Sequence, residues 1–313
     1  MQGRILKRRL SWSILIWFVI VLLPVYAISD VVIKNPYVFK AHVYKGQLHA
    51  HTTNSDGTAS PFYLVTAYKN AGFNFVAVTD HDYVTPSPSV NGILFVQGVE
   101  ETAIGGHLTV FNATKNVDTQ VSQSIIDIQN ADGAIVSLAH PNYSNGWTDS
   151  EIGELHDHYS LEVYNGVVER LEGSSAAYSE NKWDNILSRG VVTWGVAVDD
   201  CHNISYSEFN SGFVLVNADN LTTDEIKESL KKGNFYASQG PSMEVTVNGS
   251  QISISVPSSS QIQWKKSGGT VIKTTNSVLS DNYILALRVV EWVNLYLLEH
   301  ASKDFQTEIF FVS

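Results

Sequence analysis

Apolar and polar positions alternate along this chain in two different ways, which divide it into a long α/β part and a shorter β part. From residue 46 to about residue 240, short apolar runs typical of buried strands alternate with segments whose apolar residues recur at helical spacing. The clearest pair is a helix over 62–71, opened by Ser60-Pro61 and closed by Gly72, followed by a strand over 73–79. Further strands are predicted over 93–96, 107–111, 133–139, 161–164, 191–198, 213–216 and 235–237, and further helices over 121–130, 174–188 and 223–231.

Strands that alternate with helices predict a largely parallel sheet. With roughly seven or eight such units, we expect an α/β fold, a (β/α) barrel or near-barrel whose reactive residues lie at the carboxyl ends of its strands. The pattern changes after Gly240-Pro241, where residues 242–313 show alternating runs rich in Ser, Thr, Val and Ile, and Asn248-Gly249 is a hairpin turn signal. We therefore expect a small all-β, sandwich-like module at the C-terminal end.

The first 29 residues are predicted to form a separate N-terminal signal or anchor segment. Basic residues at the start precede a nearly apolar run from Trp12 to Ile28, close to the lower limit for a spanning helix and slightly long for a signal-peptide core. A retained membrane anchor and a cleaved signal both fit. Either way the charge bias places the protein outside the cytoplasm, at the cell membrane or secreted. The expected domains are thus 1–29, a catalytic α/β domain over 30–241, and the β module over 242–313.

Charge and cysteine content narrow the possible partners. The chain carries 20 Lys and Arg against 31 Asp and Glu, a net charge of −11, which argues against a broad nucleic-acid-binding surface. Bound metal cations can neutralise part of this acidity. Cys201 is the single cysteine, so no intrachain disulfide forms, and its position predicts a small core residue. The oligomeric state is not readable from the sequence.

Histidines and carboxylates follow the predicted strands at their ends. His49 and His51 are separated by one residue, so an extended backbone points both rings to one side, and Asp56 follows on a polar turn. Imidazole with carboxylate suits Zn, Mn or Fe. The candidate metal ligands are His49, His51, Asp56, His81, Glu100, His107, His140, Asp200 and His202. These are too many for one ion, so two or three divalent ions are expected, with Glu100 as the bridging carboxylate.

Several of these positions also admit structural roles. Taken singly, His107 fits a core histidine bonded to a carbonyl, and His140, which precedes a proline, fits a structural residue. Glu101 is expected to face solvent or to support the ligands from behind. Asp80 is expected to orient an imidazole rather than bind metal.

Two further patterns each allow two interpretations. Asp199 could exchange roles with Asp200, but the Asp-x-His spacing favours Asp200. His156-Asp157-His158 repeats the His-x-His spacing in a polar stretch predicted to be helical, where residues i and i+2 diverge by about 200°. No metal site is therefore expected at that second pair.

The ordered motifs resemble those of the PHP (polymerase and histidinol phosphatase) family. They are Leu48-His49-Ala50-His51-Thr52 with Ser55-Asp56-Gly57, Thr79-Asp80-His81-Asp82, Gly98-Val99-Glu100, Gly106-His107, Ala139-His140-Pro141 and Asp200-Cys201-His202. The stretch from Asn234 to Pro241 further resembles the end of the domain in the carbaryl-hydrolase-like branch. The resemblance implies a distorted seven-stranded (β/α) barrel with two or three metal ions at its mouth.

The resemblance also implies a distribution of the ligands. One ion would lie at His49, His51, Glu100 and Asp200, a second at Glu100, His107 and His140, and a third at Asp56, His81 and His202. Asp56 stands where some members of the family have histidine.

Together these features predict an extracytoplasmic metal-dependent hydrolase. The first expectation is a phosphoesterase acting on a small phosphorylated molecule through a water held between two ions, with His81 or Asp82 protonating the leaving oxygen. One alternative is cleavage of a carbamate, ester or amide at the same centre, as the carbaryl-hydrolase-like branch suggests. The other is a non-catalytic, metal-containing surface protein that binds a partner.

Overall fold

The computed structural model describes residues 40–144, 146–240, 242–248, 251–266, 269–284 and 307–310. The predicted signal or anchor segment over 1–29 lies outside the described residues, and so does the choice between anchor and cleaved signal. Among the helices that are described, none has the length and apolar character needed to cross a membrane.

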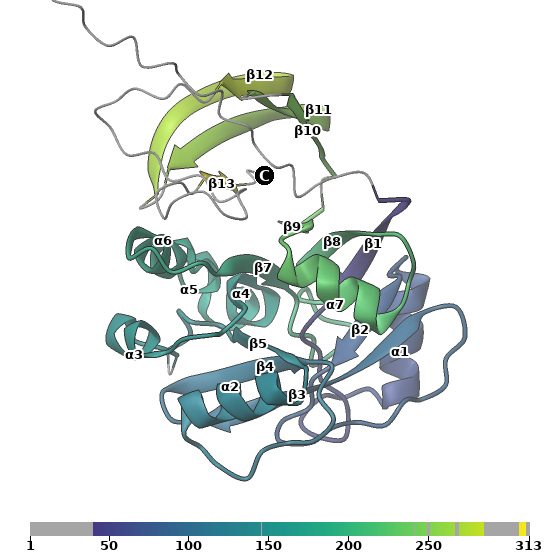
Figure 1. Cartoon of the computed structure of the whole chain (residues 1–313). Coiled ribbons are helices and arrows are strands. Elements are labelled where there is room, and N and C mark those ends of the chain that lie inside the picture. The colour runs from purple at the N-terminus through teal and green to yellow at the C-terminus, as the bar shows by residue number, and fades with distance from the viewer. Residues whose placement is uncertain are drawn as a thin grey trace, which may run out of the picture. The chain divides into compact units, whose positions relative to one another are not determined.

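One nine-stranded mixed sheet forms the frame of the α/β part (Figure 1), and its strand order is β7-β6-β5-β4-β3-β2-β1-β8-β9. Strand β7 also contacts β8 and β9, so the sheet curls into a nearly closed barrel. The strands are β1 (His42–Gln47), β2 (Phe75–Val78), β3 (Leu94–Ala103), β4 (Gly106–Phe111), β5 (Ile135–Leu138), β6 (Ser160–Asn165), β7 (Trp194–Val198), β8 (Phe213–Ala218) and β9 (Phe235–Ser238). The α/β barrel expected from the sequence is confirmed.

The sequence-based expectation of a largely parallel sheet was wrong in part. The pairs β1–β2, β2–β3, β5–β6 and β6–β7 are parallel, whereas β3–β4, β4–β5, β1–β8 and β8–β9 are antiparallel. The sheet is therefore mixed rather than largely parallel. A tight turn through Ile104 and Gly105, the latter at φ 99°, lets β3 and β4 form a hairpin without an intervening helix.

The helices cover the sheet and follow the predicted amphipathic segments. They are α1 (Pro61–Asn70), α2 (Ser122–Ala131), α3 (Asp149–Glu154), α4 (Gly166–Glu172), α5 (Ser174–Ala177), α6 (Glu180–Ser188) and α7 (Thr223–Lys231). Helix α7 coincides with its predicted range and begins after Thr222, whose side chain accepts the backbone N–H of Glu225. The helix predicted over 174–188 is divided into α5 and α6, and α4 was not predicted; Gly173, at φ 86°, separates α4 from α5.

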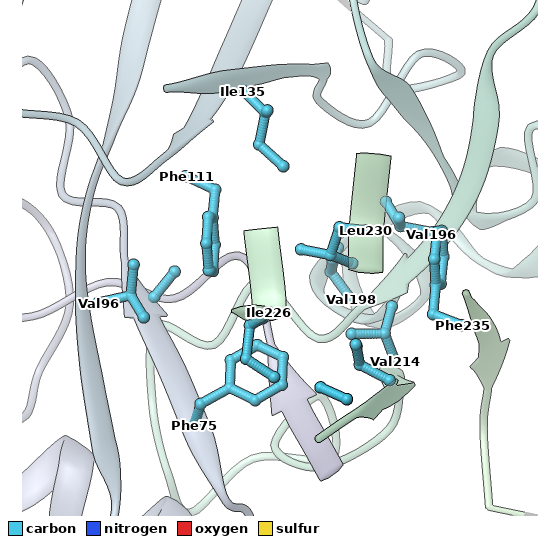
Figure 2. Close-up of a cluster of buried hydrophobic side chains, with 13 residues drawn as sticks. Phe75, Val96, Phe111, Ile135, Val196, Val198, Val214, Ile226, Leu230 and Phe235 are labelled. Atoms are coloured by element: carbon cyan, nitrogen blue, oxygen red, sulfur yellow. The ribbon is translucent and has the colours of Figure 1, made fainter. Parts of the chain in front are cut away.

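Apolar side chains from around the sheet fill the space that it encloses. Figure 2 shows Phe75, Val96, Phe111 and Val214 converging with Ile226 and Leu230 of α7, all of them buried. Full burial of one such side chain contributes roughly 1.5 to 3 kcal/mol. The barrel is thus a packed core rather than a pore, and the polar chemistry is placed at strand ends.

The C-terminal residues that are described form a separate antiparallel sheet. Its strands are β10 (Glu244–Asn248), β11 (Gln251–Lys266), β12 (Thr270–Ile284) and β13 (Thr307–Phe310), in the order β10-β11-β12 with β13 also paired to β11. Asn248 pairs with Gln251 in antiparallel β10 and β11, and the turn residues between them lie outside the described residues. Ile252, Ile254 and Trp264 belong to its buried apolar cluster. The all-β character of this region is confirmed, and the domain boundaries stay a prediction.

Candidate metal centre

All nine predicted ligands come together at one end of the barrel. His49 and His51 follow β1, Asp56 lies in the next loop, His81 follows β2, Glu100 and His107 lie on β3 and β4, His140 follows β5, and Asp200 and His202 follow β7. Each of the nine has a ring nitrogen or carboxylate oxygen within 3.6 Å of another member. The side chains of His49 and His51 are fully buried, whereas that of Asp56 is 55% exposed, so the cluster runs from a closed floor to an open rim.

Backbone contacts explain why His49 and His51 point the same way. Ala50 forms an isolated parallel bridge with Cys201, and the His51 N–H donates to the Cys201 carbonyl at 3.0 Å. On the other side, the Thr79 N–H donates to the Ala50 carbonyl at 2.9 Å. The segment is therefore held extended, both rings lie on one side, and Ala50 and Cys201 point into the apolar core. The prediction of Cys201 as a small core residue is confirmed.

Four atoms converge in the most buried part of the cluster. The Nε2 atoms of His49 and His51 lie 3.0 Å apart, and Glu100 Oε2 lies 3.1 Å from each. Asp200 Oδ1 lies 3.2 Å from His49 Nε2 and 3.1 Å from His51 Nε2. Ligand atoms around one tetrahedral ion at about 2.1 Å would be separated by about 3.4 Å. Asp200 Oδ1 is buried and accepts no hydrogen bond from the described residues, so these four atoms fit the ligand atoms of a cation.

Glu100 joins this group to a second one. Its Oε1 atom lies 2.9 Å from His107 Nδ1 and 3.0 Å from His140 Nε2, while Oε2 faces the first group. His81 Nδ1 also approaches Glu100 Oε2 at 3.2 Å. Imidazoles therefore surround both oxygens of one buried carboxylate, the arrangement expected of a bridging ligand.

The outermost group is arranged around Asp56. Its Oδ2 atom lies 3.3 Å from His202 Nε2 and 3.6 Å from His81 Nε2. The turn carrying Asp56 packs tightly, because a Cβ added at Gly57 would lie 2.4 Å from the His51 carbonyl oxygen. Only glycine fits that approach, which keeps Asp56 at the rim of the cluster.

Mutual electrostatics hold the carboxylates ionised. Burial alone would raise the pKa of Glu100, but the neighbouring histidines hold it well below its usual range. Burial opposes the charged form of His51, yet contacts with Asp200 and Glu100 raise its pKa to about 9. Burial dominates at His81, and its pKa is lowered. The centre attracts positive charge strongly, as a cation site does.

Two of the ligands have strained backbones. His140 and Asp200 adopt φ angles of 28° and 51°, in the left-handed region that residues other than glycine rarely occupy. Such conformations cost of order 1 kcal/mol or more and cluster at functional sites. Here they turn each side chain back toward the shared group of atoms.

A buried carboxylate that the sequence analysis missed supports the ligands from behind. Glu162, on β6, accepts His49 Nδ1 at 2.7 Å through Oε1, and its Oε2 accepts the His140 N–H at 2.7 Å. Asn165 donates from Nδ2 to both Glu162 and Asp200. The bond from His49 Nδ1 leaves its Nε2 lone pair for the cluster. A charged residue inside the apolar run 161–164 was the signal that could have revealed it.

Two acidic neighbours, Asp80 and Glu101, make other contacts than expected, and a third, Asp82, is bonded to a threonine. Asp80 does not orient an imidazole among the described residues: it accepts from the Thr52 N–H at 2.7 Å and from the Ser55 hydroxyl at 2.8 Å, and so shapes the loop that carries Asp56. Glu101 does not face solvent; it is buried, bonded to Gln129 and the Val117 N–H, and burial raises its pKa to about 7. Asp82 accepts hydrogen bonds from the Thr102 N–H and hydroxyl, at 2.8 Å each, and its role in protonating the leaving oxygen stays a prediction.

The choice of Asp200 over Asp199 agrees with the contacts in the structure. Asp200 contacts the rings, whereas Asp199 accepts the Tyr68 hydroxyl at 2.7 Å and the Asn210 N–H at 2.8 Å. In the second His-x-His pair, His156 bonds its own neighbour Asp157, and His158 is buried with no hydrogen-bond partner among the described residues. That segment lies in the loop after α3 rather than in a helix, so the predicted reason was wrong, and the expectation of no metal site there stays a prediction.

A cleft of about 300 Å³ opens above the ligands. This volume lies at the lower end of the range for small-molecule sites. The side chains that line it are Asp56, His81, Glu100, His107, His140, Tyr143, Val167, Val168, Arg170, Leu171, Asp200 and His202.

Comparison with known proteins gives a likeness of fold. No family model and no curated protein matches the chain. Among solved structures, a two-domain protein from Bacteroides vulgatus containing a predicted PHP-like metal-dependent phosphoesterase is 17% identical, with a TM-score of 0.48 over 77% of this chain and 85% of that one. The lesion-specific endonuclease EndoQ from Pyrococcus furiosus is 15% identical, with a TM-score of 0.46 over 63% of this chain and 58% of that one.

A candidate metal-dependent phosphoesterase from Bifidobacterium adolescentis is also 15% identical, with a TM-score of 0.42 over 60% of this chain and 96% of that one. These levels of similarity describe a likeness of the backbone trace alone. The residues of this chain define a nearly closed α/β barrel with buried histidine and carboxylate clusters that can hold divalent metal ions.

Proposed function

We propose that this protein is a metal-dependent phosphoesterase of the PHP type that acts on a small phosphorylated molecule. The observation that carries the proposal is the position of Glu100, whose two oxygens are both faced by imidazole nitrogens in a buried cluster. A single carboxylate shared between two groups of nitrogen donors suits two neighbouring divalent ions better than one. Zn, Mn and Fe all match this donor chemistry.

The proposed ligand sets follow the three groups of contacts. His49, His51, Glu100 and Asp200 would hold the first ion, Glu100, His107 and His140 the second, and Asp56, His81 and His202 the third. Bound divalent ions lower the pKa of water and neutralise the charge that develops on a phosphoryl group. The exposure of Asp56 makes the third set the weakest of the three, so two ions are the minimum complement.

Three residues of this chain are candidates to donate a hydrogen bond to the leaving oxygen. Both nitrogens of His81 face carboxylates, which favours a ligand role over proton donation, and both oxygens of Asp82 already bind Thr102. Tyr143 lines the cleft with its ring edge-on to His140, at a centroid distance of 5.5 Å. We propose that its hydroxyl, in place of His81 or Asp82, donates a hydrogen bond to the leaving oxygen.

Location and substrate remain part of the proposal. Placement outside the cytoplasm, by an N-terminal anchor or by secretion, rests on the sequence of residues 1–29. The net charge of −11 favours a small-molecule substrate over nucleic acid.

The test is hydrolysis by protein reconstituted separately with Zn, Mn and Fe. We expect release of p-nitrophenol from p-nitrophenyl phosphate or its bis-ester, loss of that activity in His49→Ala and Glu100→Ala, and retention in His156→Ala, a histidine outside the cluster. Turnover of p-nitrophenyl acetate alone would replace the proposal with carbonyl hydrolysis. A protein that binds metal but turns over none of the three would be a non-catalytic metal protein.

A further inference from the structure

One cationic side chain shares the cleft with the ligands but belongs to none of their groups. Arg170, on α4, is the single Lys or Arg among the described residues that line this cleft. No contact between its guanidinium and any of the nine ligands occurs in the described part of the chain, whereas each ligand contacts another. Arg170 is therefore a separate charged feature of the same cleft.

The position of Arg170 is fixed by two residues of the loop between β7 and β8. Its Nε donates to Glu208 Oε2 at 2.7 Å, and the Glu208 side chain is fully buried. The guanidinium carbon lies 4.9 Å from the ring centroid of Tyr206, in a cation–π contact. The same loop carries Asp200 and His202, so the guanidinium and the metal ligands are held by one segment.

This anchoring leaves the planar end of the guanidinium available. Arginine has five N–H donors, and the bond to Glu208 uses the one on Nε. The two terminal nitrogens make no hydrogen bond to the described residues, and the side chain is 28% exposed. Two parallel N–H groups are the fork that binds a carboxylate or phosphate in bidentate fashion. An arginine held in advance by its neighbours loses little entropy when it does so.

We propose that Arg170 forms a second anion subsite, which selects a phosphoester whose leaving group carries its own carboxylate or phosphate. The reacting phosphoryl group belongs to the ligand cluster, a placement that rests on the proposed function. Val167, Val168 and Leu171 lie beside Arg170 in the cleft wall and accommodate an apolar body between the two anionic ends. The preferred substrate is therefore a small molecule bound at both anionic ends, and a simple alkyl or aryl phosphate is a poorer substrate.

Binding of two matched, non-hydrolysable phosphonates tests the subsite directly. 4-Phosphonobenzoate carries a carboxylate where 4-phosphonobenzamide carries a neutral amide of the same shape. In titration calorimetry with the metal-loaded protein, we expect the benzoate to bind roughly 10- to 100-fold more tightly, as for hydrogen bonds to a charged group. Equal affinities would overturn the proposal.

Variants assign that preference to Arg170. Removing Arg170 alone would leave Glu208 buried and unpaired, so the main variant is the double substitution Arg170→Gln/Glu208→Gln, in which two amides can pair. We expect the preference to vanish in this variant and in Arg170→Gln where it folds, and to persist in Arg189→Gln, whose guanidinium lies at the end of α6 near Asp149. A preference that survives the double substitution, or an equal loss of affinity for both phosphonates, would show that Arg170 does not bind the second anion.

Turnover of 4-carboxyphenyl phosphate and 4-carbamoylphenyl phosphate separates this inference from the proposed function. Hydrolysis of both with an Arg170-dependent preference for the carboxylate supports both proposals. An Arg170-dependent binding preference for 4-phosphonobenzoate, with no hydrolysis of either ester, would reject the phosphoesterase and leave the subsite standing. Hydrolysis of both esters at equal rates in parent and double variant would reject the subsite alone.

Discussion

The Nε2 atom of His49 points at the Nε2 atom of His51 from a distance of 3.0 Å, in a fully buried position. Because His49 Nδ1 is bonded to Glu162, its Nε2 presents a lone pair to the space that it shares with Glu100 and Asp200. Electron-rich atoms gathered this closely require a cation between them, either protons or a metal ion. Protons and a metal ion therefore compete for this position.

Metal affinity should fall as the pH is lowered. The carboxylates raise the pKa of His51 to about 9 despite its burial, so in metal-free protein at pH 7 an ion must displace a proton from it. Each displaced proton weakens binding up to about tenfold per pH unit below that pKa. Chelator competition from pH 6.5 to 9 measures the slope, and proton release can be followed in weak buffer. An affinity independent of pH would contradict the assignment of His51.

The same shift sets a stability trend for the metal-free protein. The folded pKa of His51, about 9, lies above its unfolded value of 6.5, so its contribution is fully present below pH 6.5 and is lost as the pH rises through 9. Added metal should reverse this loss at alkaline pH. Thermal melts with and without Zn at pH 6.5 and 9 report both effects.

Glu162→Gln should weaken metal binding although Glu162 is not a ligand. Its two oxygens hold the His49 ring and the His140 backbone, and removal of such supports typically costs about 10- to 100-fold in metal affinity. Competition with a fluorescent chelator measures the change. Glu154→Gln, at an exposed position on α3, is the matched control and should bind metal as the parent does. Unchanged affinity in Glu162→Gln would refute the supporting role.

Asp80→Ala should remove one ion and spare the others. Asp80 accepts from Thr52, Ser55 and Thr85, and these bonds shape the loop that presents Asp56. Metal analysis after gel filtration should show the loss of one equivalent, with the buried set around His49 retained. Asp82→Ala is the control, because among the described hydrogen bonds the Asp82 side chain binds only Thr102. Full metal content with abolished activity in that control would restore Asp82 as the catalytic acid.

Tyr143→Phe should lower kcat with a dependence on the leaving group. A hydroxyl that assists the leaving oxygen matters most when that oxygen is strongly basic, and general acid assistance contributes about 100- to 10,000-fold. We expect a much larger decrease with phenyl phosphate than with p-nitrophenyl phosphate, at unchanged metal content. An equal decrease for both substrates would assign Tyr143 to binding instead.

His158→Leu should stabilise the protein in mild acid. Burial, with no hydrogen-bond partner among the described residues, lowers the pKa of His158 to about 4. Between about pH 6.5 and 4, His158 is therefore protonated in the unfolded state and neutral in the folded state. Stability from this source is lost as the pH falls through that window, by up to about 3 kcal/mol. Denaturant unfolding at pH 7 and 4.5 should show a gain for the variant that is larger at pH 4.5. His156→Leu, exposed in the same loop, should show little difference between the two.

Much of the fold was predictable because it depends on neighbours in the sequence. The apolar spacing of 223–231 places α7 where the structure has it. The His-x-His spacing at residues 49 and 51 needs only an extended backbone to put two rings on one side. The break between α5 and α6 and the mixed direction of the strands were not predictable in this way, since periodicity does not record strand direction.

The sequence by itself identified nine histidines and carboxylates that the structure brings together at one end of the barrel, and their role as metal ligands stays a proposal. Only the tertiary structure decided what each atom faces. Glu162 reaches His49 across 113 positions, and Arg170 meets Glu208 across 38. Such contacts are set by the curvature of the sheet and the packing of its loops. Local spacing contains no information about either, so the support behind the ligands and the proposed anion subsite emerged only from the folded chain.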